Sequence, residues 1–393
     1  MNKKVILFAG LGVLLLIIIY FIVDPVGTIT VSGSREPQKD TGKPTLKVYI
    51  ENSGSMDGYM SQGSELKDAV YAYISDLNSE CGTVLLNYIN SDVIPYKGDL
   101  ESYIKTMNPQ TFAMAGGNRS ATDISAIIKR VLTAVDDNTV AIFVSDCILA
   151  LPAVNSTKQL NFCKTTIKNA IESRRKKIPD LGVQILKMES TFTGTYYQLS
   201  GNEQLAGVKR PYYIWIFGRA GTLARLNREA DYTALPGYKD MVAFTAPVQN
   251  AWKVSDKSDH TSGIHAKGEN YELMISADMR QSLQPESVIT DKSNYKFDNN
   301  RLTIENIQPS TTDNKYSHII RFKMPENTHV NNVALTFNQP PIPKWIAATN
   351  EDKGLNITAN LSKTTGIGSI IGGVAEAYRK DKAVSTMKIN IKY

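Results

Sequence analysis

Oxygen-bearing side chains follow the first strand-like run of the chain. Residues 46–50 (LKVYI) are β-prone, and Glu51, Ser53 and Ser55 come directly after them. A carboxylate and two hydroxyls at alternating positions offer hard oxygen ligands, which suit Mg²⁺ or Mn²⁺. The spacing therefore predicts a divalent-cation site at the end of this strand.

Two further oxygen-bearing residues are expected at the same place. Thr122 lies in the loop GGNRSATDI, before an amphipathic helix, and Asp146 ends the run TVAIFVSD. In an open α/β sheet, ligands bind outside the carboxyl ends of the strands. We therefore expect three loops that are far apart in sequence to converge. The predicted metal ligands are Glu51, Ser53, Ser55, Thr122 and Asp146.

This set resembles the metal-ion-dependent adhesion site of the von Willebrand factor A domain superfamily. That family has Asp-x-Ser-x-Ser after the first strand, a Thr in a middle loop and an Asp after the central strand. The matching residues here are Ser53, Ser55, Thr122 and Asp146. The resemblance covers roughly residues 44–220 and departs from the family at Glu51, which stands in place of Asp. It implies a bound divalent cation whose coordination sphere is completed by a carboxylate of a protein partner.

Strand-like and helix-like segments alternate through the first half of the chain. The strand-like runs are 46–50, 83–89, 139–145, 183–188 and 212–217, and helical faces are expected within 65–79, 122–135 and 160–171. Strands that alternate with helices of this length indicate βαβ units. The expected fold is α/β, with a doubly wound, mostly parallel sheet over residues 45–235.

The pattern changes after about residue 235. Apolar residues recur at every second position within 316–324, 333–337 and 387–393. Alternation with period two is typical of antiparallel strands with one buried face. We predict a β-rich, sandwich-like domain over residues 236–393, interrupted by one helix within 367–378.

The N-terminus carries an uninterrupted apolar run. Residues 5–23 contain no charge, and as a helix they would span about 28 Å, close to the hydrocarbon thickness of a bilayer. Lys3 and Lys4 precede the run, so the positive-inside rule predicts a cytoplasmic N-terminus and extracytoplasmic domains. A cleaved signal peptide is the alternative, but the run is longer than usual. Residues 24–44 are expected to form a flexible linker.

The overall composition narrows the possible classes of protein. The chain has 44 Lys and Arg against 38 Asp and Glu, a net charge of +6 over 393 residues, which is weak for a nucleic-acid binder. Three cysteines exclude a disulfide-built scaffold. The basic run at 174–177 is expected to be a solvated helix end, with contact to an acidic partner or a phospholipid as the alternative.

These observations lead to three functional hypotheses. The first is a non-enzymatic, membrane-anchored protein that binds a divalent cation and a protein partner, in adhesion or in assembly of an envelope complex. The second is a metal-dependent hydrolase or phosphoryl-transfer enzyme, for which the first-strand motif offers only Glu51 and Asp57. The third is a structural module with a degenerate metal site, in which partner binding lies elsewhere.

Overall fold

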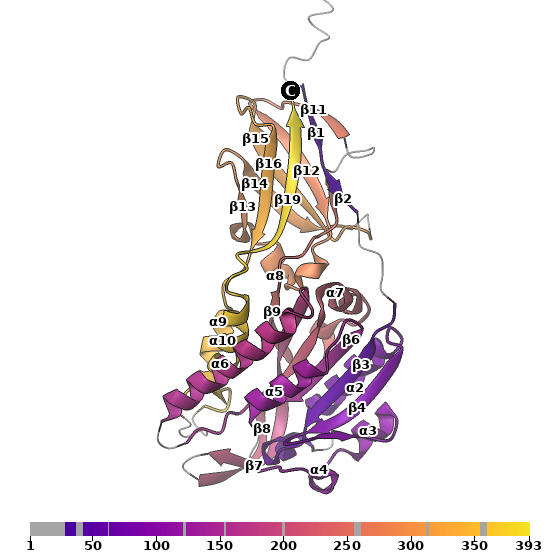
Figure 1. Ribbon diagram of the computed structural model, residues 1–393, viewed down its shortest axis with the longest axis vertical. Helices are drawn as coiled ribbons and strands as arrows, with labels where there is room; N and C mark the ends of the chain where they lie inside the picture. Colours follow the sequence, from indigo (N-terminus) through magenta and orange to yellow (C-terminus); the bar gives the residue numbers. More distant parts are fainter. Residues whose placement is uncertain are drawn as a thin grey trace, which may run out of the picture.

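The computed structural model describes residues 28–36, 42–61, 63–120, 123–152, 155–198, 201–254, 261–311, 314–353 and 360–393. These residues form two units stacked along the long axis of the molecule, an α/β unit and a β-rich unit (Figure 1). The chain begins and ends its described course in the β-rich unit. The α/β unit lies at the opposite end of the long axis.

The α/β unit is built on a seven-stranded sheet. Its strands are β3 (Thr45–Glu51), β4 (Thr83–Ile89), β5 (Val93–Pro95), β6 (Thr139–Ser145), β7 (Leu181–Gln198), β8 (Gly201–Arg219) and β9 (Tyr238–Thr245). Its helices are η1 (Gly54–Tyr59, a 3₁₀ helix), α2 (Glu65–Asn78), α3 (Leu100–Thr106), α4 (Pro109–Ala115), α5 (Ile124–Thr133), α6 (Ser156–Arg175), α7 (Ala220–Glu229), α9 (Lys344–Thr349) and α10 (Ile367–Tyr378).

The strand directions contradict the predicted fold class. The order is β5-β4-β3-β6-β8-β7-β9, and only β4, β3 and β6 run parallel, whereas β5, β8, β7 and β9 pair antiparallel with their neighbours. The sheet is therefore mixed and not a doubly wound parallel sheet. The physical reason is that β7 and β8 are two arms of one hairpin, which needs no crossover helix.

Helices cover both faces of this sheet. One apolar cluster joins α5, α6 and α10 to side chains on one face, among them Phe143, Ile185 and Trp215. The other face, including Val48, packs with α2 and α7 in a second cluster. The strand β6 is buried along its whole length, as expected for a strand with helices on both sides.

The β-rich unit consists of two five-stranded antiparallel sheets. One has the order β11-β1-β19-β16-β13 and the other β14-β15-β12-β10-β2. The strands are β1 (Thr28–Ser32), β2 (Ser34–Arg35), β10 (Trp252–Val254), β11 (Thr261–His265), β12 (Asn270–Ala277), β13 (Tyr295–Phe297), β14 (Thr303–Pro309), β15 (His318–Pro325), β16 (Asn332–Asn338) and β19 (Ala383–Lys392). Phe297 and Phe322, from different sheets, have ring centroids 4.9 Å apart, so the sheets share one core.

Neither unit is a continuous stretch of chain. The first two strands, β1 and β2, lie in the β-rich unit although they fall within the predicted linker 24–44. Conversely α10, from the C-terminal half, packs against α6 on the α/β sheet. The chain therefore enters the β-rich unit, leaves it to form most of the α/β unit, and returns.

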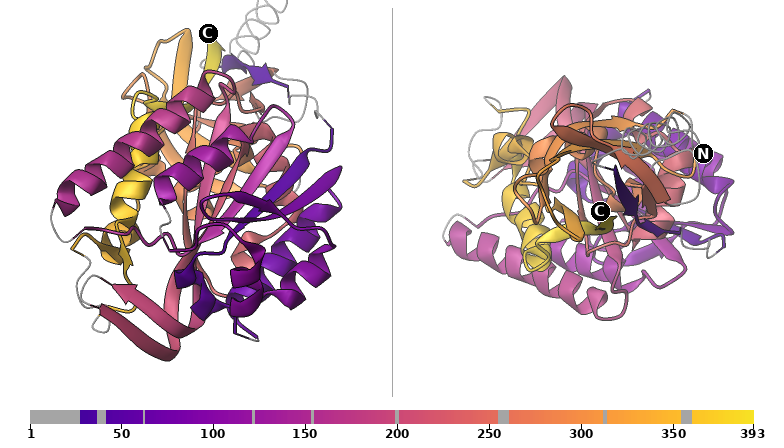
Figure 2. Two further views of the ribbon diagram at one scale, coloured as in Figure 1. Left: turned by 60° about the horizontal axis from the view of Figure 1, so that its bottom comes forward. Right: turned by 90° about the horizontal axis from the view of Figure 1, so that it is seen from above.

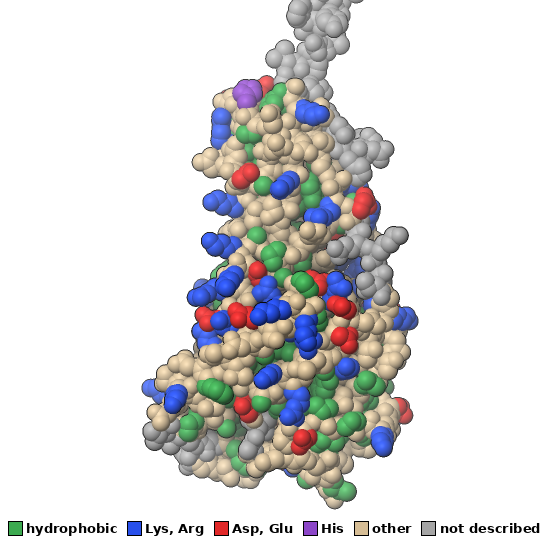
Figure 3. All heavy atoms as spheres, in the orientation of Figure 1, with side chains coloured by type: hydrophobic (Ala, Val, Ile, Leu, Met, Phe, Trp, Pro, Cys, Tyr) green, Lys and Arg blue, Asp and Glu red, His purple; other side chains and the backbone are tan. Residues whose placement is uncertain are grey.

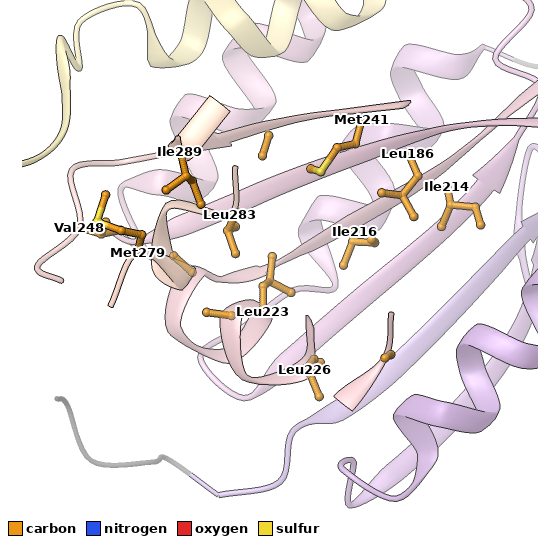
Figure 4. Close-up of a cluster of buried hydrophobic side chains, with 14 of the residues drawn as sticks. Leu186, Ile214, Ile216, Leu223, Leu226, Met241, Val248, Met279, Leu283 and Ile289 are labelled. Atoms are coloured by element: carbon orange, nitrogen blue, oxygen red, sulfur yellow. The ribbon is translucent and has the colours of Figure 1, made fainter. Parts of the chain in front are cut away.

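An apolar cluster joins the two units. Side chains from β7, β8 and β9 meet those of α7 and of the connecting segment after β12, among them Leu283 and Ile289 on or near α8 (Glu286–Ile289) (Figure 4). Gln184 of β7 donates a hydrogen bond to the Leu283 carbonyl. The units therefore share a core and are not linked by a flexible tether.

The hairpin of β7 and β8 is much longer than the rest of the sheet. Its strands pair from Leu181 with Arg219 out to Gln198 with Gly201, but β6 pairs with β8 only over 213–217. The outer half forms an arm that extends beyond the other strands (Figure 2). This arm leaves the sheet at its carboxyl edge, where the site was predicted.

Candidate functional site

The structure brings four of the five predicted ligands together. Glu51 is the last residue of β3, and Asp146 follows the neighbouring parallel strand β6. Ser53 and Ser55 lie at the start of η1. Thr122 lies outside the described residues. Because β3 and β6 are adjacent and parallel, their carboxyl ends meet at one edge of the sheet, as the sequence predicts.

The two carboxylates are enclosed in the protein. Glu51 and Asp146 are each only 1% exposed. The Ser145 hydroxyl donates a hydrogen bond to Glu51. Burial and the negative charge of Asp146 raise the pKa of Glu51 to about 8, although hydrogen bonds from Ser145 and Ser53 oppose the shift. Glu51 therefore holds a proton at neutral pH.

Asp146 is bound from several directions. Burial raises its pKa, and hydrogen bonds from Ser55 and from the Ile148 N–H, together with the positive charge of Arg210, act in the opposite direction. The Ile148 N–H lies 3.2 Å from Asp146 Oδ1. The other oxygen, Oδ2, is buried and has no hydrogen-bond partner among the described residues.

The two serines and the loop around them are already bonded within the protein. The hydroxyls of Ser53 and Ser55 lie 3.0 Å apart. Arg119 reaches into the same loop, donating hydrogen bonds to the carbonyls of Asn52 and Ser53 and forming an ion pair with Asp57. A positive charge of the protein therefore occupies the outer side of this loop.

Arg210 is the main residue of the candidate site that was not predicted from the sequence. It lies on β8, is fully buried, and its guanidinium stacks over the Tyr196 ring at 4.4 Å from the centroid. It also donates hydrogen bonds to the carbonyls of Leu361 and Lys363. A buried Arg needs compensating partners; besides these carbonyls, the charge of Arg210 acts on Asp146 and lowers its pKa.

The hairpin arm covers the loop that carries the serines. The Tyr197 ring packs on Gly54, where a methyl group would lie 3.4 Å away. At Gly58 the Phe192 ring is so close that a methyl group would lie 2.3 Å from it, which explains the glycine. The Tyr59 hydroxyl donates to the Pro211 carbonyl at 2.6 Å.

A segment from the C-terminal half closes the other side. The Tyr213 hydroxyl donates to Thr364 Oγ1 at 3.0 Å, and the Leu149 N–H donates to the Thr365 carbonyl at 3.0 Å. These contacts fix residues 364–365 against the loop that follows Asp146. The carboxyl edge of the sheet is therefore sealed by two chain segments that were predicted to lie elsewhere.

The predicted metal-ion-dependent adhesion site is corrected by these contacts. Across the part of the chain that the structure describes, no group of three or more His, Cys, Asp or Glu side chains is placed to hold a metal ion. The octahedral shell of Mg²⁺ needs several converging oxygens. Here the hydroxyls bond to each other, Glu51 is bonded to Ser145, and two arginines supply positive charge.

The predicted transmembrane helix has no counterpart among the residues that the structure describes. Within the described ranges, which begin at residue 28, no helix is long and apolar enough to cross a membrane. Residues 5–23, on which that prediction rests, lie outside those ranges.

Comparison with models of known protein families gives no match, and comparison with curated protein sequences gives none either. The resemblance to the von Willebrand factor A superfamily therefore rests on the sequence motif alone.

Proposed function

We propose that the protein is a non-catalytic binding module that recognises a protein partner away from the carboxyl edge of its α/β sheet. The observation that carries this proposal is the burial of Glu51, Asp146 and Arg210, in which the positive charge of Arg210 acts on Asp146. With a proton on Glu51, only Asp146 carries a negative charge. The positive charge of Arg210 compensates it. The edge is then a structural core, and it corresponds to the degenerate-site hypothesis.

The contacts of Asp57 speak against the hydrolase alternative. That hypothesis needs a free carboxylate next to Glu51 at the strand end. Asp57 is held in an ion pair with Arg119, and Glu51 is protonated and enclosed. These contacts favour a non-catalytic role over the hydrolase alternative.

Titration of the purified chain with Mg²⁺ or Mn²⁺, followed by thermal unfolding, tests this proposal. We expect no change in the unfolding temperature, and the same result for the Ser53→Ala/Ser55→Ala double variant. A functional site would behave differently, because a cation at ~100 times its dissociation constant adds ~2.7 kcal/mol to the free energy of unfolding. Stabilisation of the wild type that disappears in the double variant would contradict the proposal.

A further inference from the structure

A groove of about 590 Å³ lies where the two units meet, away from the sealed edge. Its walls come from β9, α10, the segment leading into α8 and a proline-rich loop at 339–343. Most of the lining is apolar, including Phe244, Val288 and Tyr378. Ile342, on the proline-rich loop, is 48% exposed. Grooves of this size and character commonly bind ligands.

The strand at the bottom of the groove is not open for pairing with another strand. β9 is the last strand of its sheet. Its outward carbonyls at Ala243 and Thr245 accept hydrogen bonds from the side chains of Gln284 and Gln339, both at 3.0 Å. These amides occupy positions that an added strand would use. A bound segment must therefore be recognised by its side chains.

The rim of the groove is basic. The helices α6 and α10 end side by side, since Arg175 donates to the Ala377 carbonyl and forms an ion pair with Asp381. Gly373 allows this close packing, because a methyl group there would lie 2.6 Å from the Lys164 carbonyl. The charged residues in 164–177 and 376–382 are nine Lys or Arg and three Asp or Glu.

Several of these cations are free to meet a ligand. Lys176, Lys177, Lys380 and Lys382 are exposed, and in the described part of the chain none of them pairs with a carboxylate. Blue side chains, with red ones among them, lie at the waist of the molecule (Figure 3). Lys382 and Arg379 also line the groove itself. The charged residues that line the groove are therefore three basic ones (Lys164, Arg379 and Lys382) and two acidic ones (Glu376 and Asp381), next to an apolar floor.

We infer that this groove binds a protein segment that carries acidic side chains next to apolar ones. The inference rests on the proposed binding-module function and names the partner's chemistry. Acidic groups would meet the lysines of the rim, and apolar groups would meet Ile342, Phe244 and Val288. A nucleic acid fits less well, because the apolar floor offers no charge to its phosphates.

The test measures binding of fluorescein-labelled peptides to the purified full-length chain. The probes are a short peptide of alternating Glu and Leu, an all-Glu peptide of the same length, and a single-stranded oligonucleotide of the same charge. The Glu/Leu peptide should bind about tenfold more tightly than either comparison probe. Equal binding of all three probes would overturn the inference, because only diffuse charge would then be recognised.

Two variants with matched controls locate the site. Lys380→Glu/Lys382→Glu should weaken binding of the Glu/Leu peptide about tenfold. The same charge change in Lys388→Glu/Lys392→Glu, on the exposed face of β19, should leave it unchanged. An equal loss in both pairs would overturn the groove as the site.

The apolar floor is tested in the same way. Ile342→Asp should abolish the preference for the Glu/Leu peptide, whereas Met114→Asp, at a residue that is 77% exposed, should not. All six side chains changed in these variants and their controls are exposed, so the fold should be kept. If the peptide does not bind, the groove is not the binding site, and the proposed function is unaffected. A Mg²⁺-dependent shift in stability would instead contradict the proposed function.

Discussion

Charged side chains are buried at one place on the α/β unit and exposed at another. At the carboxyl edge of the sheet, Glu51, Asp146 and Arg210 are buried and balance one another. At the groove beside β9, Lys380 and Lys382 are exposed and have no carboxylate partner in the described ranges. The first arrangement stabilises the fold, and the second is available to a partner.

The comparison shows why the presence of ligand-type residues does not define a site. The edge carries residues expected for chemistry, yet the described ones, Glu51, Ser53, Ser55 and Asp146, bond to neighbours within the protein, apart from Asp146 Oδ2. The charges near the groove include part of the basic run 174–177, and those of Lys176, Lys177, Lys380 and Lys382 face solvent. Accessibility and charge balance, which depend on the tertiary fold, separate the two.

The largest effect is expected from removing the buried cation at the edge. Arg210→Met keeps a long side chain but leaves Asp146 buried without a counter-ion. We expect the free energy of unfolding at neutral pH to fall by ~3–5 kcal/mol, measured by chemical denaturation. Adding Asp146→Asn to this variant should recover part of the loss, because the unpaired charge is then gone.

Arg119→Met provides the comparison within the same region. Its side chain is 21% exposed and pairs with Asp57 near the surface, so the expected loss is ~1 kcal/mol or less. If Arg210→Met lowers the free energy of unfolding by no more than Arg119→Met does, the buried guanidinium does not compensate the carboxylates. The contrast between the carboxyl edge and the groove is then lost.

The smallest effect is expected at the groove. Lys380→Glu/Lys382→Glu should change the free energy of unfolding by no more than ~0.5 kcal/mol, because both side chains are exposed and unpaired. The same chemical denaturation measures this change. A loss of several kcal/mol would show that the lysines support the packing of α10, and that they are not kept for a partner.

Local patterns predicted the elements near the site well. The run before Glu51 and the run TVAIFVS are the adjacent strands β3 and β6, and the helical face within 122–135 contains α5. These follow from short-range periodicity, which depends on the burial of one face. The convergence of Glu51, Ser53, Ser55 and Asp146 could be predicted for the same reason.

Strand direction and the covering segments could not be predicted in this way. The alternating pattern predicts parallel strands at 183–188 and 212–217, whereas β7 (Leu181–Gln198) and β8 (Gly201–Arg219) pair antiparallel as one hairpin. The intervening residues are rich in Thr and Tyr and contain no helical face, which is the one sequence feature that favours a hairpin. Arg210 and residues 361–365 meet only through long-range packing, for which no local pattern exists.

The most direct test of the central claim is the pH dependence of stability for the wild type and Glu51→Gln. The pKa of Glu51 is raised from 4.5 to about 8 in the folded protein, mainly by burial. Its contribution to stability is therefore complete below pH ~4.5 and is lost as the pH rises through about 8. The glutamine variant resembles the protonated form and lacks this dependence.

Chemical denaturation between about pH 5 and about pH 8 should show the wild type losing stability relative to Glu51→Gln by up to ~1.4 kcal/mol per pH unit. Such a loss means that Glu51 is protonated in the folded protein. Parallel curves, or a wild type that gains stability relative to the variant as the pH rises, would contradict a carboxylate pair balanced by one proton and Arg210.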